Sequence, residues 1–271
     1  MGDRRVTLLE VLVIVLIRGL GEVLPLGASG HLAALPMLAG SDDGRAALSV
    51  AAHLGILLAL MAYFWRDVGN MGVGVWRLAK GKPDGGSRLF LHLAVGTIPA
   101  AAAGWFLIDH VAGLAPPVTA AALVFGGGVL LLACDKLGVT VRRIEHMSFA
   151  GSFGLGLLQV LALIPGVSRT GITITIARLL GWERQAAARF SLLLAMPLIQ
   201  GHGGRTFLGL WRQGELILSA DLMIAAAAAA LVSLAAVAAM MAWVERHTFL
   251  PFAVERIVFG AGAMGLALWI G

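Results

Sequence analysis

Long apolar stretches run through this chain from end to end, and short polar connections separate them. In helical form, about 20 apolar residues cross the roughly 30 Å hydrocarbon core of a bilayer. The pattern therefore predicts an all-α polytopic membrane protein. About six stretches are predicted as transmembrane helices, at residues 47–65, 89–108, 119–133, 190–210, 222–244 and 252–270.

Polar turns interrupt two further apolar segments, the first of them near the N-terminus. Residues 6–24 carry Arg18 and Glu22 in their second half and end at Pro25. The apolar segment that follows, residues 31–38, is too short to cross a bilayer. Charged side chains at bilayer depth must face protein or water. We therefore predict a helix followed by a re-entrant helical hairpin.

A second broken element lies past the middle of the chain. Residues 149–164 are apolar but short and rich in glycine, and they run into Pro165. Another short helix is expected to follow the turn, at residues 171–180. The order of helix, break and helix repeats that of the first element, so we predict a second re-entrant pair.

The two broken elements also resemble each other in sequence. Residues 19–25, GLGEVLP, match residues 156–162, GLLQVLA, at glycine, leucine and acid-or-amide positions. An odd number of predicted spans separates the copies, which inverts the second copy in the membrane. We predict a single membrane domain, residues 1–271, built as an inverted repeat of approximate halves 6–133 and 149–270, whose broken helices meet at one site.

Composition supports the membrane class and excludes several others. Of the 271 residues, 59% are hydrophobic and 13% charged, against about 45–50% and about 25% in soluble domains. The net charge of +5 does not indicate nucleic-acid binding, because the basic residues are scattered through short connections without interleaved aromatic residues. Many lie in connections 66–88 and 136–143, which are predicted to be cytoplasmic. A single cysteine excludes a disulfide framework.

Residues 165–173, PGVSRTGIT, form the polar turn of the second broken element. A charge at bilayer depth costs roughly 2.5 to 3.5 kcal/mol, so Arg169 is expected to have an anionic partner. A helix beginning at this turn directs unpaired backbone N–H groups at the break, and such a helix terminus binds phosphate. Ser168, Thr170 and Thr173 add hydroxyl groups. The alternative is a Pro-Gly turn whose arginine reaches the membrane interface.

The first broken element offers acid and base groups. Arg18 and Glu22 are four residues apart and share a helix face, which allows a simple ion pair. Glu22 can otherwise hold a divalent cation against a diphosphate, or act as a base. His31 is a candidate proton donor or nucleophile. Ser29 supplies a hydroxyl group or a helix cap.

Two other histidines are candidates for the same cavity. His53 lies within an apolar stretch. His202 and Arg205 follow Pro197 at the edge of another stretch, and the pair fits either the rim of a site or an anchor at the interface.

Residues 165–173 resemble the P-G-x-S-R-S-G-x-T signature of the bacterial undecaprenyl-pyrophosphate phosphatases of the bacitracin-resistance type, and residues 22–32 resemble the first signature of that family. The resemblance covers essentially the whole chain. It implies an all-helical inverted repeat in the bacterial inner membrane with a site open to the periplasm. It also implies removal of one phosphate from undecaprenyl diphosphate, with a divalent cation such as Mg²⁺ or Ca²⁺, to recycle the lipid carrier for cell-wall glycans such as peptidoglycan.

The resemblance also implies roles for individual residues. Glu22, His31, Ser168 and Arg169 are the predicted catalytic residues, and Glu22 is the candidate metal ligand. The other residues of the two motifs and of the second repeat are predicted to bind substrate: Ser29, Gln159, Gly166, Thr170 and Thr173. Arg18 is predicted to bind substrate from its charge and not from the resemblance.

Three positions depart from the family pattern. Arg18 stands where the first member of an acidic or amide pair is expected, and it would repel a divalent cation. Gly27 and Ala28 stand where paired serines are expected, which excludes a hydroxyl nucleophile at those two positions. These departures argue against metal-dependent hydrolysis but not against anion binding. They suggest a clamp in which Arg18 and Arg169 together hold a lipid phosphate or diphosphate.

Two functions follow from these observations. The first is a polyprenyl diphosphatase in which His31 attacks phosphorus or donates a proton while arginines stabilise the transferred charge. The alternative is a flippase that moves polyprenyl phosphate or a related anionic lipid across the bilayer without hydrolysis. A homodimer is compatible with either function.

Overall fold

The computed structural model describes residues 8–34, 42–111, 116–214 and 219–270. Within these ranges the regular structure is helical, apart from one isolated β-bridge between Arg142 and Trp182, which confirms the all-α prediction. The helices, in chain order, are α1 (Leu8–Val23), α2 (Ala28–Ala34), α3 (Asp42–Tyr63), α4 (Trp65–Ala79), α5 (Gly85–Val111), α6 (Pro117–Leu137), η2 (Ile144–His146), α7 (Phe149–Gln159), η3 (Val160–Leu163), α8 (Arg169–Leu179), α9 (Arg184–Gln213), α10 (Ala220–Val244) and α11 (Leu250–Ile270).

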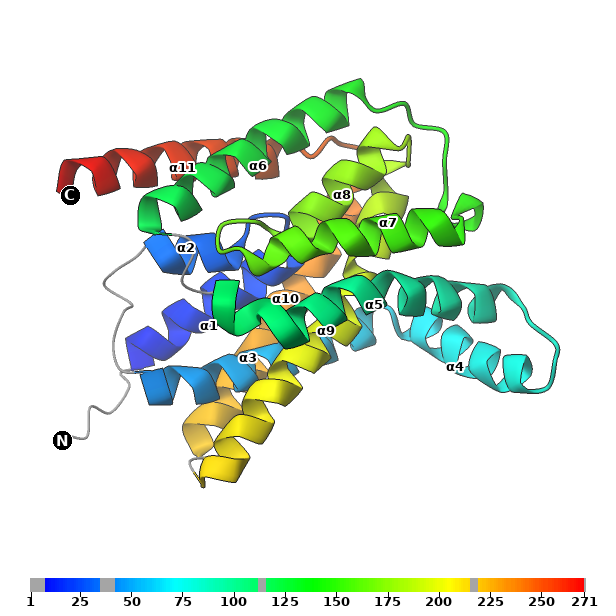
Figure 1. Cartoon of the computed structure of the whole chain (residues 1–271), viewed down its shortest axis with the longest axis horizontal. Coiled ribbons are helices and arrows are strands. Elements are labelled where there is room, and N and C mark those ends of the chain that lie inside the picture. Colours follow the sequence, from blue (N-terminus) through cyan, green and yellow to red (C-terminus); the bar gives the residue numbers. More distant parts are fainter. Residues whose placement is uncertain (1–7, 35–41, 112–115, 215–218, 271) are drawn as a thin grey trace.

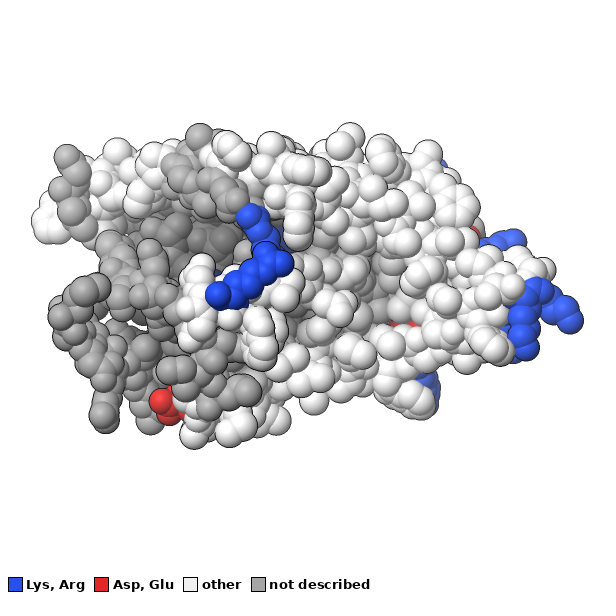
Figure 2. Space-filling view, turned by 60° about the horizontal axis from the view of Figure 1, so that its bottom comes forward, with Lys and Arg blue, Asp and Glu red and all other residues white. Residues whose placement is uncertain are grey.

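Five helices in the described part of the chain are long and apolar enough to cross a membrane: α3, α5, α6, α10 and α11. Large apolar side chains such as Phe106, Leu231 and Leu268 point outward from them. Much of the face in Figure 2 is free of charge, and basic residues gather at the tip where α4 meets α5 (Figure 2). The chain is therefore a multi-pass membrane protein. A sixth predicted span lies within α9, which is not among the five and carries Arg189 and His202.

The helices are arranged in pairs. α6 lies alongside α11, and α3 lies against α10 and α9 (Figure 1). α5 packs on α7 along one side and on α4 along the other, while α8 lies between α6 and α9. The α3–α10 contact is close at Gly55, where a Cβ atom would lie 2.2 Å from the Ala226 carbonyl oxygen. Small residues thus allow the approach of these two spans.

The basic connection at 66–88 is not a loop, as a count of its charges suggested, because most of it forms α4. Trp65 and Trp76 remain exposed on α4, so the helix has an apolar face as well as a charged one. The charged residues made this segment resemble a loop in the sequence. Asp84 accepts a hydrogen bond of 2.9 Å from the Ser87 backbone N–H at the start of α5. This bond, and a second from the Ser87 hydroxyl, lower the pKa of Asp84.

Both predicted helix breaks are present. α1 is followed by a turn through Pro25 and Gly27, whose φ of +91° favours glycine, before α2 begins. α7 and η3 are followed by a turn through Gly166, with φ of +98°, before α8 begins. The two turns lie against each other, because a Cβ atom on Gly27 would lie 3.6 Å from the Gly166 carbonyl oxygen, and one on Gly30 in α2 would lie 2.8 Å from the Gly166 Cα. The end of the first predicted hairpin, residues 35–38, lies outside the described residues.

A buried ionic cluster fixes the far end of α8. Arg178, which is fully buried, donates through Nε to Asp135 Oδ1 at 2.8 Å, and Arg184 does the same from α9. The other Asp135 oxygen accepts the Phe249 backbone N–H at 3.0 Å. One carboxylate thereby joins α6, α8 and α9 to the start of α11.

Candidate active site

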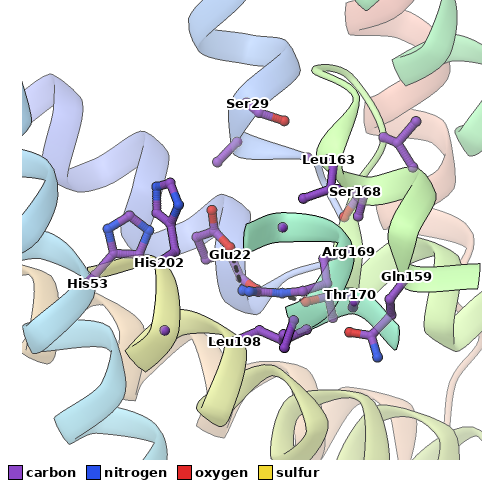
Figure 3. A pocket seen from close by; sticks show the side chains of 18 of the residues that line it. Glu22, Ser29, His53, Gln159, Leu163, Ser168, Arg169, Thr170, Leu198 and His202 are labelled. Atoms are coloured by element: carbon purple, nitrogen blue, oxygen red, sulfur yellow. Dashed lines mark hydrogen bonds and ion pairs between the residues drawn. The ribbon is translucent and has the colours of Figure 1, made fainter. Parts of the chain in front are cut away.

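A pocket of about 420 Å³ opens where the two helix breaks meet. Glu22 and Arg169 lie near its centre, with the two histidines on one side and Gln159 on the other (Figure 3). α5 and η3 contribute an apolar stretch of wall that includes Trp105 and Leu163. The pocket thus combines charged groups with an apolar surface, as a lipid with a charged head requires.

The central contact joins the two broken elements. Arg169 donates through Nη2 to Glu22 Oε2 at 2.7 Å, and both side chains are mostly buried (Figure 3). The Thr170 hydroxyl donates to the Glu22 backbone carbonyl at 2.8 Å. Among the ion pairs of the described residues, Glu22 pairs with Arg169 and not with Arg18, although Arg18 lies within electrostatic range. The intrahelical pair that the sequence allowed is therefore not the one formed.

The N-terminus of α8 forms part of the wall. Ser168 is the N-cap residue, and its hydroxyl oxygen accepts the Gly171 backbone N–H at 3.0 Å. Ser168, Arg169 and Thr170 all line the pocket. The first turn of α8 thus brings a positive helix end, a guanidinium and hydroxyl groups to one place, which is a phosphate-binding arrangement.

Two predicted substrate-binding residues of this turn lie outside the pocket lining. The Thr173 hydroxyl donates back to the Arg169 carbonyl at 3.0 Å. Gly166 packs so closely on α6 that a Cβ atom would lie 2.3 Å from the Ala120 carbonyl oxygen. Both residues shape the turn, and substrate binding by them stays a prediction.

His31 is also outside the pocket lining, although the neighbouring Ser29 is part of it. Its Nδ1 lies 3.0 Å from the Gly27 carbonyl oxygen and its Nε2 lies 2.8 Å from Glu255 Oε1. The ring also stacks on Phe259 with 3.8 Å between centroids. Both ring nitrogens thus have partners, and the catalytic role of His31 stays a prediction that this geometry does not support.

The wall of the pocket across from Arg169 contains histidines whose position the sequence did not determine. His53 is buried and donates through Nδ1 to the Ser49 carbonyl at 2.6 Å. Its ring meets the His202 ring edge-on, with 5.2 Å between centroids. Arg205 lies over Trp105, with its Cζ 5.9 Å from the ring centroid. α3 and α9 bring these groups together, and no sequence motif connects them.

Several polar atoms of the pocket residues are buried without a partner. Gln159 is 2% exposed, and neither its amide nitrogen nor its amide oxygen has a hydrogen bond. The Nε atoms of Arg18 and Arg169 are also buried and have no hydrogen-bond partner. Buried polar groups in proteins are normally satisfied, so these atoms mark where a polar ligand would bind.

The donor set does not fit a divalent cation held by the protein. Mg²⁺ and Ca²⁺ require several oxygen ligands, whereas Glu22 is the one carboxylate in the described pocket lining and is bonded to Arg169. Across the described residues, no group of three or more His, Cys, Asp or Glu side chains could hold a metal ion. The predicted metal role of Glu22 therefore finds no support in the geometry.

Comparison with known proteins places these features in a family. Residues 11–262 match the family described as bacitracin resistance protein BacA. The chain is 65% identical over 260 residues to undecaprenyl-diphosphatase 1 of Paramagnetospirillum magneticum, covering 96% of this chain and 97% of the relative. It is 47% identical over 269 residues to undecaprenyl-diphosphatase 1 of Rhodospirillum rubrum, covering 96% and 95%. For the undecaprenyl-diphosphatase of Roseobacter denitrificans the identity is 39% over 259 residues, covering 94% and 96%.

Proposed function

This chain belongs to the bacitracin resistance protein BacA family, and we propose that it is an undecaprenyl-diphosphatase that works in the pocket around Glu22 and Arg169. The observation that carries the proposal is the 2.7 Å contact between these two side chains at the N-terminus of α8. A carboxylate that can act as a base there adjoins a guanidinium and a helix end that can hold phosphate.

Substrate binding uses the groups at the two helix breaks. The Arg169 guanidinium and the first-turn N–H groups of α8, apart from that of Gly171, which the Ser168 hydroxyl accepts, donate to phosphate oxygens. Ser29 and Ser168 line the same site. The unpartnered Gln159 amide supplies a further donor. The isoprenoid chain lies along the apolar wall near Trp105 and Leu163.

Hydrolysis begins when Arg169 exchanges its carboxylate partner for phosphate oxygens. The released Glu22 carboxylate takes a proton from water as the water oxygen bonds to the terminal phosphorus. The bond from that phosphorus to the bridging oxygen breaks, and the bridging oxygen leaves with the electron pair on undecaprenyl phosphate. Inorganic phosphate is the second product. Arg169 stabilises the charge that develops on the phosphoryl oxygens.

We further infer an inner-membrane location with the pocket facing the periplasm, and an inverted repeat whose re-entrant pairs are α1–α2 and α7–α8. The contact between the turns at Gly27 and Gly166 supports the paired breaks. The basic connections between α4 and α5 and between α6 and α7 support an opposite, cytoplasmic side. A homodimer stays a prediction.

Phosphate release from undecaprenyl diphosphate by the purified chain in detergent tests the proposal. Arg169→Ala is expected to lower the rate about a hundredfold or more, because enzymes lose about this much when one hydrogen-bond donor to the transition state is removed. Arg143→Ala, at an exposed arginine paired with Glu183 outside the pocket, is the control and is expected to keep full activity. An inactive wild-type chain that moves polyprenyl phosphate between the leaflets of liposomes would replace this function with the flippase.

A further inference from the structure

His53 and His202 lie on the side of the pocket away from the N-terminus of α8, and Arg18 is close enough for its charge to act on both. Figure 3 shows Glu22 between the two histidines and Arg169. Arg18 lines the same pocket from α1, one helical turn before Glu22. The pocket therefore has basic groups on both sides of one carboxylate.

These three side chains are arranged to receive a ligand. The Arg18 Nε is buried and has no hydrogen-bond partner. His53 is fixed through its Nδ1–H to Ser49, and its ring contacts the His202 ring edge-on. His202 keeps an exposed side chain within the pocket. A donor group without a partner therefore lines the same pocket as a histidine that another histidine holds in place.

The charge of the pocket also indicates a ligand with more than one negative charge. Its described lining contains Arg18, Arg169 and Arg205 with Glu22 as the one acid, a formal charge of +2 with neutral histidines. The phosphate site at α8 uses one of these arginines, so positive charge remains on the Arg18 side. The donor set of the described pocket lining does not fit a divalent cation, because Glu22 is its one carboxylate.

We propose that Arg18 and His202, with His53 packing His202 in place, form a second phosphate subsite that selects a diphosphate over a monophosphate and takes the place of a divalent cation. The proposal rests on the proposed function, since it assigns the two phosphates of its substrate to the two sides of the pocket. Arg18 and His202 donate hydrogen bonds to one phosphate, and the α8 turn with Arg169 holds the other.

Binding of two matched short-chain ligands to the full chain in detergent separates the subsites. Farnesyl methylenebisphosphonate carries two phosphorus groups and cannot be hydrolysed at the bridge, whereas farnesyl monophosphate carries one. With EDTA present, the wild type is expected to bind the bisphosphonate more tightly. Arg18→Gln is expected to weaken that binding about tenfold or more, because it removes charged hydrogen bonds. The single phosphate of farnesyl monophosphate is expected to occupy the α8 site with Arg169, so its binding is expected to change by less than about twofold.

Two controls address folding. Arg18→Lys keeps the charge and is expected to keep most of the selectivity, and Arg212→Gln, at an exposed arginine outside the pocket, is expected to change neither affinity. If Arg18→Gln does not fold, His202→Ala provides the same test at an exposed position. Its loss of bisphosphonate affinity is expected to be smaller but still larger than its loss of monophosphate affinity. An equal loss of affinity for both ligands in Arg18→Gln, or no loss for either, would overturn the proposed subsite.

A charge reversal tests the replacement of the cation. Arg18→Glu places two carboxylates one turn apart on α1, a pair of oxygen ligands for a divalent cation beside the diphosphate. Bisphosphonate binding by this variant is expected to fall in EDTA and to recover with Mg²⁺, while wild-type binding is the same in both. Wild-type binding that requires Mg²⁺ would refute the replacement. Selective binding without phosphate release would instead remove the proposed hydrolysis and leave the subsite standing.

Discussion

At the scale of single residues, the contact between Glu22 and Arg169 connects the two halves of the site. Each group is costly at bilayer depth by itself, and the 2.7 Å pair offsets that cost until a phosphate arrives. The sequence predicted both residues because charges in apolar segments are conspicuous. It did not predict that they pair, because 147 positions separate them.

Glu22→Gln tests whether the Glu22 carboxylate acts in catalysis or only in structure. The amide keeps the shape of the side chain but cannot take a proton from water, so kcat for phosphate release is expected to fall about a hundredfold or more. Substrate affinity is expected to hold or rise, because a negative charge near the phosphates is removed. Steady-state kinetics on undecaprenyl diphosphate measures both. An unchanged kcat would exclude Glu22 as the base.

His31 and Glu255 form a 2.8 Å pair that supports the turn carrying Gly27 and Ser29. If His31 acts by positioning this turn, as its two partners indicate, His31→Gln and Glu255→Gln are expected to lower kcat/KM by similar factors. Phosphate-release assays of the two variants compare them. Loss of activity with His31→Gln alone, while Glu255→Gln keeps full activity, would show direct proton transfer or nucleophilic attack by His31.

At the scale of elements, hydropathy and turn residues predicted the helix breaks correctly because Pro25, Gly27 and Gly166 interrupt strongly apolar segments. The helix α4 was missed because its charges outweighed its apolar face in a simple count. The ionic cluster around Asp135 was also missed. Its partners come from α8, α9 and the residue before α11, and nothing in the local sequence indicates their meeting.

Asp135→Ala tests how much this cluster stabilises the assembly of helices. The substitution leaves the fully buried Arg178 without its carboxylate, and the free energy of unfolding is expected to fall by about 3 to 5 kcal/mol. Thermal or detergent-induced unfolding measures the loss. Glu183→Gln, in an exposed pair with Arg143, is the control and is expected to change stability little. An equal loss in both variants would contradict the structural role of Asp135.

At the scale of the whole molecule, the apolar stretches were sufficient to predict a polytopic helical protein, since crossing a bilayer fixes helix length and composition. The α8 side of the pocket was also predictable, because its signature is contiguous in the sequence. The other side could not be predicted in full. His53 and His202 come from α3 and α9, and the packing of those helices alone brings their rings to 5.2 Å.

The central claim is that water attacks the terminal phosphorus of undecaprenyl diphosphate in this pocket. Hydrolysis in ¹⁸O-labelled water, followed by mass spectrometry of both products, tests it most directly. The account predicts one ¹⁸O atom in inorganic phosphate and none in undecaprenyl phosphate with the wild-type chain, and the same labelled product formed about a hundredfold or more slowly with Arg169→Ala. Label in the lipid phosphate, or no phosphate release by the wild type, would contradict it.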